Sequence, residues 1–305
     1  MKKILIIGGS GFIGSSITKK LIKNSKIYIL DIKKNNNSKY LKKYIYKFIK
    51  GDISKSSTFN KIKLRFDVVY YLASKTSSKV SEDFPKGCFE TNLDGTLNLF
   101  NWAIRYKPKK IIFTSSMSVY GENAENAKET DKCKPVSFYG ISKLASENIL
   151  LKLKAYNIKI FIFRLFNVYG PGQNYKNLVQ GMLSIYLAQA YKTKKVKVTG
   201  SLKRFRDFVF IDDVVNILTK NLKYYDNKDN IYNVGTGKKT YVKSLLMLIF
   251  KSLKLKSNII IKKGHSGDTW GTYSNSNKLK QLGLTCNTLL KNGLDKTIKE
   301  LKKEL

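Results

Sequence analysis

Tyr139 and Lys143 are the two residues whose types and spacing most directly suggest chemistry. They stand four positions apart at the start of an amphipathic segment, so a helix would place them on one face. A phenol has an unperturbed pKa of about 10, and both a neighbouring ammonium group and a helix N-terminus stabilise its phenolate. The pair therefore predicts a general base that operates near neutral pH. Because the chain is rich in lysine, this spacing also arises by chance, and the interpretation depends on the other motifs.

The glycine-rich segment from Gly8 to Gly14 is the second candidate for chemistry. It follows an apolar run at residues 3–7, and apolar residues recur at helical spacing over residues 12–22. Glycines let backbone N–H groups approach a pyrophosphate, and a helix N-terminus favours an anion. The spacing is G-x-x-G-x-x-G and not the G-x-G-x-x-G of the dinucleotide fingerprint, so a glycine turn in some other α/β protein is the alternative. We predict a dinucleotide-binding turn that uses Gly8, Gly11, Phe12, Ile13 and Gly14.

Asp31 indicates which dinucleotide binds. A second apolar run, residues 26–30, ends at Asp31, twenty residues after Gly11. An acidic residue at about this distance hydrogen-bonds the adenine ribose and repels a 2′-phosphate. This predicts NAD, rather than NADP, as the cofactor. Two alternatives stay open: Lys33 and Lys34 lie near enough in sequence to bind a phosphate, and a surface aspartate can simply end a strand.

An alternation of strands and helices would position these residues. Apolar runs lie near residues 3–7, 26–31, 46–50, 67–73, 110–115 and 158–166, with helix-like segments between them. This rhythm predicts an α/β fold, a Rossmann-type doubly wound parallel sheet. Such sheets bind ligands outside the carboxyl ends of their strands. Those ends carry the segments that begin at Gly8, Asp31, Asp52, Ala73, Ser115–Ser116 and Phe166–Asn167.

The rhythm changes after the segment Tyr169-Gly170-Pro171-Gly172, because proline and glycine mark a break there. We therefore predict an NAD-binding domain over residues 1–169, to which residues 206–238 return. Residues 170–305 are expected to form mainly a smaller C-terminal substrate-binding lobe.

Composition narrows the partners. The formal net charge is +37, but only five of the 58 basic residues are arginine, and lysine is spread along the whole chain. We interpret this as a basic solvated surface that attracts anionic substrates, and we expect no nucleic-acid partner. No run is long and apolar enough for a membrane span, and the N-terminus enters the first strand directly. Three widely spaced cysteines, Cys88, Cys133 and Cys286, show no metal-ligand pattern, which predicts a reduced, cytoplasmic protein without a metal.

Further segments match a known family in order along the chain. They are Gly51-Asp52-Ile53, Asp67 to Ser74, Thr91 to Thr96, Phe113 to Gly121, Arg164 to Pro171, Arg206 to Val209, Asp212 to Val214 and Tyr232 to Gly237. Together with the two motifs above, they resemble the extended short-chain dehydrogenase/reductase family, in its nucleotide-sugar epimerase/dehydratase branch. The resemblance runs almost end to end, so the fold and an NAD-dependent activity are expected together.

The resemblance implies roles at matching positions. Tyr139 would take a proton from a sugar hydroxyl, Ser116 would hydrogen-bond the reacting oxygen, and Lys143 would hold the nicotinamide ribose. Asn167 and Arg206 would face the diphosphate of a nucleotide-diphosphate sugar, and Asp268 would meet a ribose hydroxyl. A homodimer is typical of the family. The implied cofactor contacts also include Asp52, Ile53, Leu72, Ala73, Ser74, Asn92, Ser115 and Phe166.

Two positions bear on the reaction. Members that eliminate water carry acidic residues where Met117 and Ser118 stand here, and decarboxylases tend to carry glutamate at the position of Ser118. The resemblance therefore favours an epimerase that acts at C4 of a sugar of the UDP-glucose or UDP-N-acetylglucosamine type. A nucleotide-4-keto-sugar reductase is the alternative, and a 4,6-dehydratase is favoured less. A non-catalytic NAD- or RNA-binding regulator is disfavoured because Ser116, Tyr139 and Lys143 are all present.

One departure concerns the phosphate grip. The family commonly reads Arg-x-Gly-Asp near the C-terminus, and this chain reads His265-Ser266-Gly267-Asp268. A protonated His265 would bind phosphate in a pH-dependent way, and an exposed loop residue is the equal alternative. The departure makes Arg206 more important, because a guanidinium binds phosphate oxygens in a bidentate geometry.

Overall fold

A parallel sheet of seven strands forms the centre of the described part of the molecule, in the order β12-β7-β5-β4-β1-β2-β3. The structure is a computed structural model, and it describes residues 1–34, 45–122, 124–176, 181–220, 230–264 and 270–304. Six of the strands confirm the six predicted runs, and the seventh, β12, comes from the second half of the chain. The strands are β1 (Lys2–Ile7), β2 (Ser25–Asp31), β3 (Ile45–Lys50), β4 (Val68–Tyr71), β5 (Lys110–Ser116), β7 (Lys159–Leu165) and β12 (Ile231–Val234).

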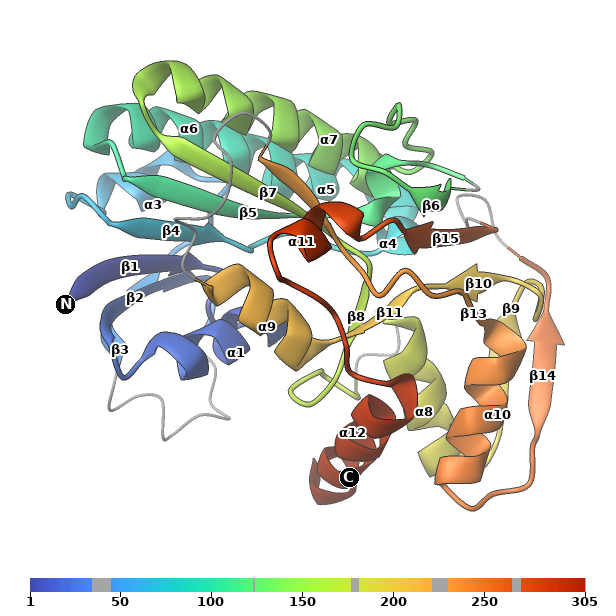
Figure 1. The fold of residues 1–305 in the computed structure, drawn as a ribbon. Coiled ribbons are helices and arrows are strands. Elements are labelled where there is room, and N and C mark those ends of the chain that lie inside the picture. Colours follow the sequence, from blue (N-terminus) through green and yellow to red (C-terminus); the bar gives the residue numbers. More distant parts are fainter. Residues whose placement is uncertain (35–44, 123, 177–180, 221–229, 265–269, 305) are drawn as a thin grey trace.

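Helices cover both faces of this sheet (Figure 1). On one face lie α3 (Ser56–Asn60), α6 (Gly95–Tyr106) and α7 (Phe138–Leu151), and on the other lie α1 (Phe12–Leu21) and α9 (Ile211–Thr219). Strand side chains alternate between two cores: Leu5 and Ile7 pack on the α6 and α7 face, while Ile4 and Ile6 pack on the α1 and α9 face. Because both faces are buried, the strands read as continuous apolar runs in the sequence. The predicted doubly wound α/β fold is confirmed.

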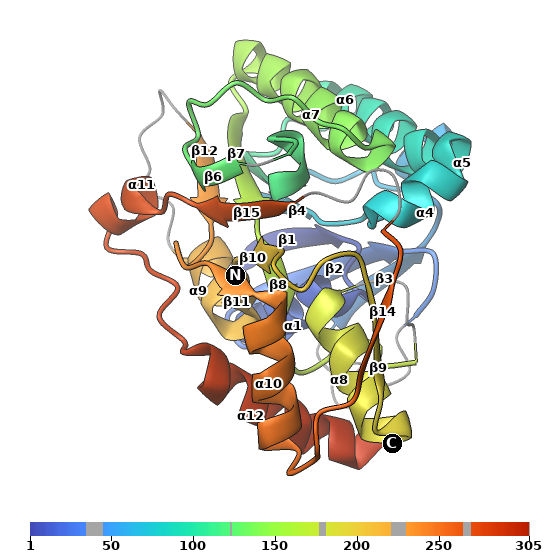
Figure 2. The same cartoon turned by 90° about the vertical axis from the view of Figure 1, so that its right-hand side faces the viewer.

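Most of the remaining elements lie beyond the carboxyl edge of the sheet. Helices α8 (Met182–Thr193), α10 (Val242–Ser252) and α12 (Leu290–Glu304) gather at the opposite end of the molecule from α6 and α7 (Figure 2). Two strand pairs accompany them, β9 (Val196–Thr199) with β14 (Ile259–Lys262), and β8 (Asn167–Tyr169) with β11 (Phe208–Phe210). Helix α11 (Asn277–Gln281) lies beside β12. The domain boundary drawn at residue 169 stays a proposal.

A four-stranded sheet joins distant parts of the chain. Its order is β13-β10-β15-β6. Strand β6 (Ala124–Ala127) follows β5 in sequence, whereas β10 (Phe205–Arg206), β13 (Thr240–Tyr241) and β15 (Gly271–Ser274) come from the second half. The C-terminal part of the chain therefore returns to the edge at which the predicted catalytic residues lie.

Three short helical segments follow β4 and precede α6 in the chain. They are α4 (Ser78–Asp83), α5 (Pro85–Phe89) and a single π-helical turn, η1 (Glu90–Asp94). Isolated π-helical turns within helices are rare and often mark functional sites. Here the turn lies against α7, which carries Tyr139 and Lys143.

Candidate active site

The turn between β1 and α1 has the shape that a phosphate group requires. Gly8 has a φ of +84°, and a Cβ there would lie 2.6 Å from the backbone nitrogen of Ala73. A Cβ on Gly14 would overlap the carbonyl oxygen of Gly8. Helix α1 then begins at Phe12 with neither a side-chain cap at Gly11 nor an acidic residue in its first turn. The N–H groups of this first turn, which have no partner within a helix, are thus left to an anion.

Asp31 ends β2 beside this turn. Its carboxylate accepts a hydrogen bond from the backbone nitrogen of Ser10 at 2.9 Å, so it fixes the glycine turn. On the next strand edge, the Asp52 carboxylate accepts both the backbone and the hydroxyl of Ser54 at 2.9 Å, and Ile53 is buried. Asp31, Asp52 and Ile53 thus line neighbouring strand ends, as a cofactor site there would need.

Asn92 supports the loop after β4 from within the π-helical turn. Its amide oxygen accepts the Ser74 hydroxyl at 2.9 Å and the Lys75 backbone nitrogen at 2.8 Å. Its amide nitrogen donates to the Lys75 carbonyl at 3.0 Å and to the Ser142 hydroxyl at 2.9 Å. The side chain is buried and uses its hydrogen-bonding capacity on protein groups. Asn92 therefore holds the segment at which Leu72, Ala73 and Ser74 are predicted to meet the cofactor, and it links that segment to α7.

Side chains satisfy the first turn of α7. The hydroxyl of Ser137 accepts the backbone nitrogen of Gly140 at 3.1 Å. From α4, the hydroxyl of Ser81 accepts the backbone nitrogen of Tyr139 at 3.0 Å, and the Glu82 carboxylate accepts that of Phe138 at 3.2 Å. These three bonds fix the backbone from which the Tyr139 phenol projects.

The predicted catalytic residues come together at the carboxyl end of β5. Ser116 is the last residue of β5 and hydrogen-bonds Tyr139. The buried Lys143 places its Nζ 4.2 Å from the centre of the Phe113 ring on the same strand. Ser115 is also buried, and its hydroxyl has no hydrogen-bond partner in the structure, so it can serve a bound ligand. A phenol, an ammonium group and two hydroxyls thus face the edge that carries the glycine turn.

Burial changes the acid–base properties of this group. It raises the pKa of Tyr139 to about 12, against the opposing hydrogen bond with Ser116. It lowers the pKa of Lys143 to about 7, against the attraction of the Glu147 carboxylate. The expectation of a phenolate near neutral pH therefore differs from the structure, because burial of the phenol outweighs its hydrogen bond with Ser116.

The residues predicted to meet the substrate lie where β8 meets β11. Asn167 donates from its backbone and its side-chain nitrogen to the carbonyl of Asp207, at 3.0 and 3.1 Å. The adjacent Arg206 is buried and donates to the carbonyls of Phe205 and Trp270, at 2.7 and 3.2 Å. Burial, together with the charge of Arg204, lowers the pKa of Arg206 to about 10. Asp207 thus brings Asn167 and Arg206 side by side. Phe166, which precedes Asn167 in the chain, is buried.

Two predicted residues, Asp268 and His265, lie outside the described residues. Within the described ranges, no group of three or more histidine, cysteine, aspartate or glutamate residues could hold a metal ion. In the same part of the chain, every helix is too short or too polar to cross a membrane.

The sequence and the fold both match known proteins. Residues 4–235 match the family described as the NAD-dependent epimerase/dehydratase family. The chain belongs to this family. A relative in Methanocaldococcus jannaschii, provisionally named UDP-glucose 4-epimerase, is 32% identical over 98% of both chains. The dTDP-D-glucose 4,6-dehydratase of Dictyostelium discoideum is 33% identical, covering 77% of this chain and 58% of its own length. The crystal structure of the Thermotoga maritima UDP-glucose 4-epimerase with UDP-glucose superposes with a TM-score of 0.92, at 29% identity and 99% coverage of both chains.

Membership of an NAD-dependent family confirms the predicted cofactor class and the enzymatic nature of the chain. It leaves the reaction open between epimerases and dehydratases. In this member of the family, the residues that follow the catalytic-site serine are uncharged. The Ser116 hydroxyl donates to that of Ser118 at 3.1 Å and accepts the Ser118 backbone nitrogen at 3.2 Å. The hydroxyl of Ser118 therefore orients that of Ser116.

Sequence reasoning missed the positioning role of Asp207. Its carboxylate is fully buried and accepts backbone N–H groups of Thr236 at 2.9 Å, Gly237 at 3.0 Å and Ser274 at 3.2 Å, with hydroxyls of Thr236 and Ser274 in addition. It joins the segment after β12 to β15 and to Arg206. The signal in the sequence was an aspartate between Phe205 and Phe208. Aspartate in such apolar surroundings is almost never fully buried unless its oxygens are paired.

Proposed function

We propose that this family member epimerises a nucleotide-diphosphate sugar at C4 through a transient 4-keto intermediate, with NAD as its resident cofactor. The observation that carries the proposal is the meeting of Ser116, Tyr139 and Lys143 at the sheet edge of the glycine turn, with the uncharged Ser118 beside Ser116. These groups suffice to move one proton at a sugar hydroxyl. Elimination of water would need a further acid.

NAD supplies the acceptor and the donor of the hydride when it is bound. Tyr139 takes the proton of the C4 hydroxyl, and Ser116, whose proton is directed at Ser118 in the structure, turns it to the same sugar oxygen. The charge of Lys143 would stabilise the Tyr139 phenolate, and the same side chain would hold the nicotinamide ribose of bound NAD. Tyr139 returns the proton after the 4-keto sugar has presented its other face, so the net redox change is zero.

The cofactor would lie along the carboxyl edge of β1, β2 and β4. The open N-terminus of α1 would hold its pyrophosphate, and Asp31 would hold its adenine ribose. The buried and unpartnered hydroxyl of Ser115 fits a polar group of the nicotinamide half. These features support the fit, since each offers a donor or an acceptor in the place that the cofactor requires.

The substrate diphosphate would lie at Arg206 and Asn167. The Arg206 guanidinium donates to the carbonyls of Phe205 and Trp270, so it is oriented before a ligand binds. Such orientation favours bidentate binding of phosphate oxygens. The name of the Thermotoga structure, a UDP-glucose 4-epimerase with UDP-glucose, makes UDP-glucose the first substrate to test.

The test is incubation of the purified protein with UDP-, dTDP-, GDP- and CDP-sugars, with product analysis by NMR and mass spectrometry. We expect the C4 epimer at unchanged mass, with no net production or consumption of NADH at 340 nm. Loss of 18 mass units would show a dehydratase. Stoichiometric consumption of NADH on a 4-keto sugar would show the reductase alternative. Either result would overturn the proposal.

We propose in addition that the protein forms a homodimer through α6 and α7. The two helices lie side by side on one surface of the molecule (Figure 1). Leu97 on α6 and Ile141 on α7 are exposed by 43% and 42%, and Phe100, Ile104 and Leu144 are only partly buried. A second copy would cover this apolar stripe by a two-fold contact. Light scattering of the wild type and of Leu97→Lys/Ile141→Lys tests it: a dimer and a monomer are expected, and a wild-type monomer would contradict it.

A further inference from the structure

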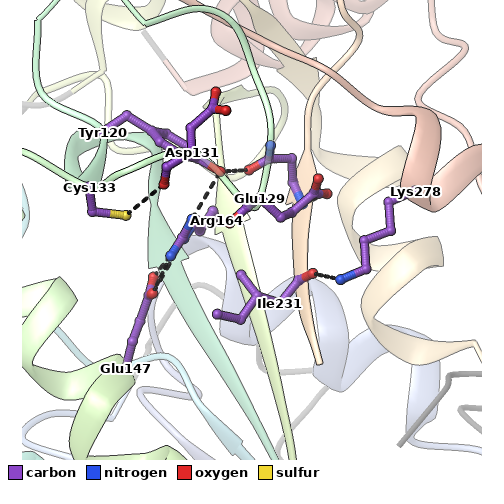
Figure 3. A network of polar contacts seen from close by, with 9 residues as sticks. Tyr120, Glu129, Asp131, Cys133, Glu147, Arg164, Ile231 and Lys278 are labelled. Atoms are coloured by element: carbon purple, nitrogen blue, oxygen red, sulfur yellow. Dashed lines mark hydrogen bonds and ion pairs between the residues drawn. The ribbon is translucent and has the colours of Figure 1, made fainter. Parts of the chain in front are cut away.

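A buried ion pair lies directly behind the catalytic group. Glu147 on α7 is 1% exposed and Arg164 on β7 is 3% exposed. The Arg164 guanidinium donates to the Glu147 carboxylate through Nη2 at 2.8 Å and through Nε at 3.1 and 3.3 Å. Figure 3 shows these two side chains pointing toward each other between the helix and the sheet. A pair this well buried is costly to desolvate and is weak evidence of stabilisation by itself, so its role needs another explanation.

The pair is tied into the sheet at the level of the site. Arg164 is the register partner of Ser115 on β5 and of Asn233 on β12. Its Nη1 also donates to the Tyr120 hydroxyl at 3.1 Å, and that hydroxyl donates to the Asn233 amide oxygen at 2.7 Å. The network therefore lies one residue before Ser116 along the strand, on the side of the sheet that α7 covers (Figure 3).

One member of the pair, Glu147, lies on the same face of α7 as Tyr139 and Lys143. Tyr139, Lys143 and Glu147 follow each other at intervals of four residues, so they form one row along the helix. Lys143 and Glu147 are both buried, one helical turn apart. Any charge on Glu147 therefore acts on Lys143 through a medium of low polarity, where it is weakly screened.

Few other groups act on the Lys143 ammonium. From β5 it meets the Phe113 ring, and from α5 the Cys88 thiol, whose pKa burial raises. Lys75, from the loop after β4, faces the same thiol. From its own helix the carboxylate of Glu147 attracts it. Among these groups of the described chain, Glu147 is the one carboxylate.

We propose that Glu147 is a positioning residue for Lys143, and that its carboxylate, fixed in place by Arg164, favours the charged form of the buried Lys143 amine. The proposal rests on the catalytic role given to Lys143 above. The division of work follows from burial. A lone buried amine tends to lose its proton. Arg164 holds the Glu147 carboxylate in place by hydrogen bonds, and Glu147 in turn favours the ammonium form of Lys143.

The test replaces the ion pair by apolar residues of similar size, Glu147→Leu/Arg164→Met. Such replacements of buried pairs often preserve stability, whereas removal of Glu147 alone would leave Arg164 buried without its carboxylate. The readout is the pH dependence of Lys143 acetylation by acetic anhydride, measured by peptide mass spectrometry on the intact protein. Burial places the wild-type pKa of Lys143 at about 7. We expect the midpoint of the double variant to fall, but by less than the roughly one to three pH units that loss of an opposite charge alone would give, because the variant also removes the positive charge of Arg164.

Tyr120→Phe is the matched control. It removes the bonds of Tyr120 to Arg164 and Asn233 from the same network but leaves the ion pair in place. We expect it to lower the melting temperature and to leave the Lys143 midpoint unchanged. A purely structural role would make both variants less stable and would move neither midpoint, and that result would overturn the proposal. If the apolar double variant does not fold, Glu147→Gln/Arg164→Gln must give the same downward shift.

Acetylation needs no substrate, so the two proposals can fail separately. An unchanged midpoint in an enzyme that epimerises UDP-glucose would refute the role of Glu147 alone. A shifted midpoint in a protein that epimerises no nucleotide sugar would refute the proposed function alone. Where both hold, the fall of kcat/KM at high pH should begin at lower pH in the double variant, because Lys143 then loses its proton earlier.

Discussion

The N-termini of α1 and α7 meet the same edge of the sheet and are built in opposite ways. Helix α1 begins at Phe12, after Gly11, which offers no side-chain cap, and it carries no acidic residue in its first turn. Helix α7 begins with its first N–H groups bound by Ser137, Ser81 and Glu82. The first helix leaves its backbone donors to a ligand. The second satisfies them internally and presents a side chain instead.

The difference explains why Tyr139 departs from the sequence-based expectation. A helix N-terminus lowers the pKa of a nearby acid only where its positive potential is left uncompensated. Here the Glu82 carboxylate accepts the N–H of Phe138 and offsets that potential. Burial then dominates and raises the pKa of Tyr139 to about 12. The phenol must therefore await the charge of Lys143 and the bound cofactor before it can act as a base.

The largest expected effect comes from removing the side chain that α7 presents. Tyr139→Phe removes only the phenolic oxygen and leaves the capped backbone of α7 unchanged. Loss of a general base costs about 10²–10⁴-fold in rate, so we expect kcat to fall by that factor while NAD affinity and melting temperature stay near wild type. Steady-state kinetics with the epimerised sugar and a fluorescence titration of NAD measure both. Near-wild-type turnover would falsify the role of Tyr139.

Gly11→Asp blocks the backbone donors that the N-terminus of α1 presents. The φ of Gly11 is −75°, which any residue adopts, and aspartate would cap α1 and place a negative charge at the pyrophosphate. We expect NAD affinity to fall roughly ten- to hundred-fold, the size of a lost charge-assisted hydrogen bond. The free energy of unfolding should change by only a few tenths of a kcal/mol, because glycine and aspartate differ little as caps. Gly11→Ala, which adds the carbon without the charge, is the control and should retain far more affinity.

The sequence predicts the first helix better than the second for a physical reason. The glycine turn, β1 and α1 are consecutive, so their geometry is encoded locally in residues 8–14. The caps of α7 come from Ser81 and Glu82, more than fifty residues earlier in the chain, and no local pattern marks them. Likewise the burial of Asp207 depends on Ser274, which β15 brings back from the C-terminal part. Local motifs were predictable, whereas the supports that set pKa values were formed by tertiary packing.

A smaller effect is expected from Asp31, which lies beside the N-terminus of α1. Asp31→Asn keeps an oxygen that can accept the Ser10 N–H but removes the negative charge beside the open end of α1. The repulsion between two unit charges at about 4 Å in water is worth about 1 kcal/mol, so we expect the preference for NAD over NADP to narrow roughly five-fold. Titration of both cofactors against the wild type and the variant measures it. If the wild type already binds both equally, Lys33 or Lys34 decides and Asp31 does not.

The smallest expected effect removes a cap from α7 and leaves function nearly unchanged. Ser137→Ala deletes the hydroxyl that accepts the Gly140 N–H, and loss of a serine cap typically lowers the free energy of unfolding by about 1 kcal/mol. Ser81 and Glu82 still accept the backbone N–H groups of Tyr139 and Phe138, so kcat should change by less than stability does. NAD affinity should stay the same, because this helix gives no backbone donor to the cofactor. Urea unfolding and NAD titration on Ser137→Ala and Gly11→Asp should therefore give opposite results: stability without affinity changes in the first, affinity without stability in the second. If Ser137→Ala weakened NAD binding as much as Gly11→Asp does, the two helix ends would share one role and the contrast between them would be wrong.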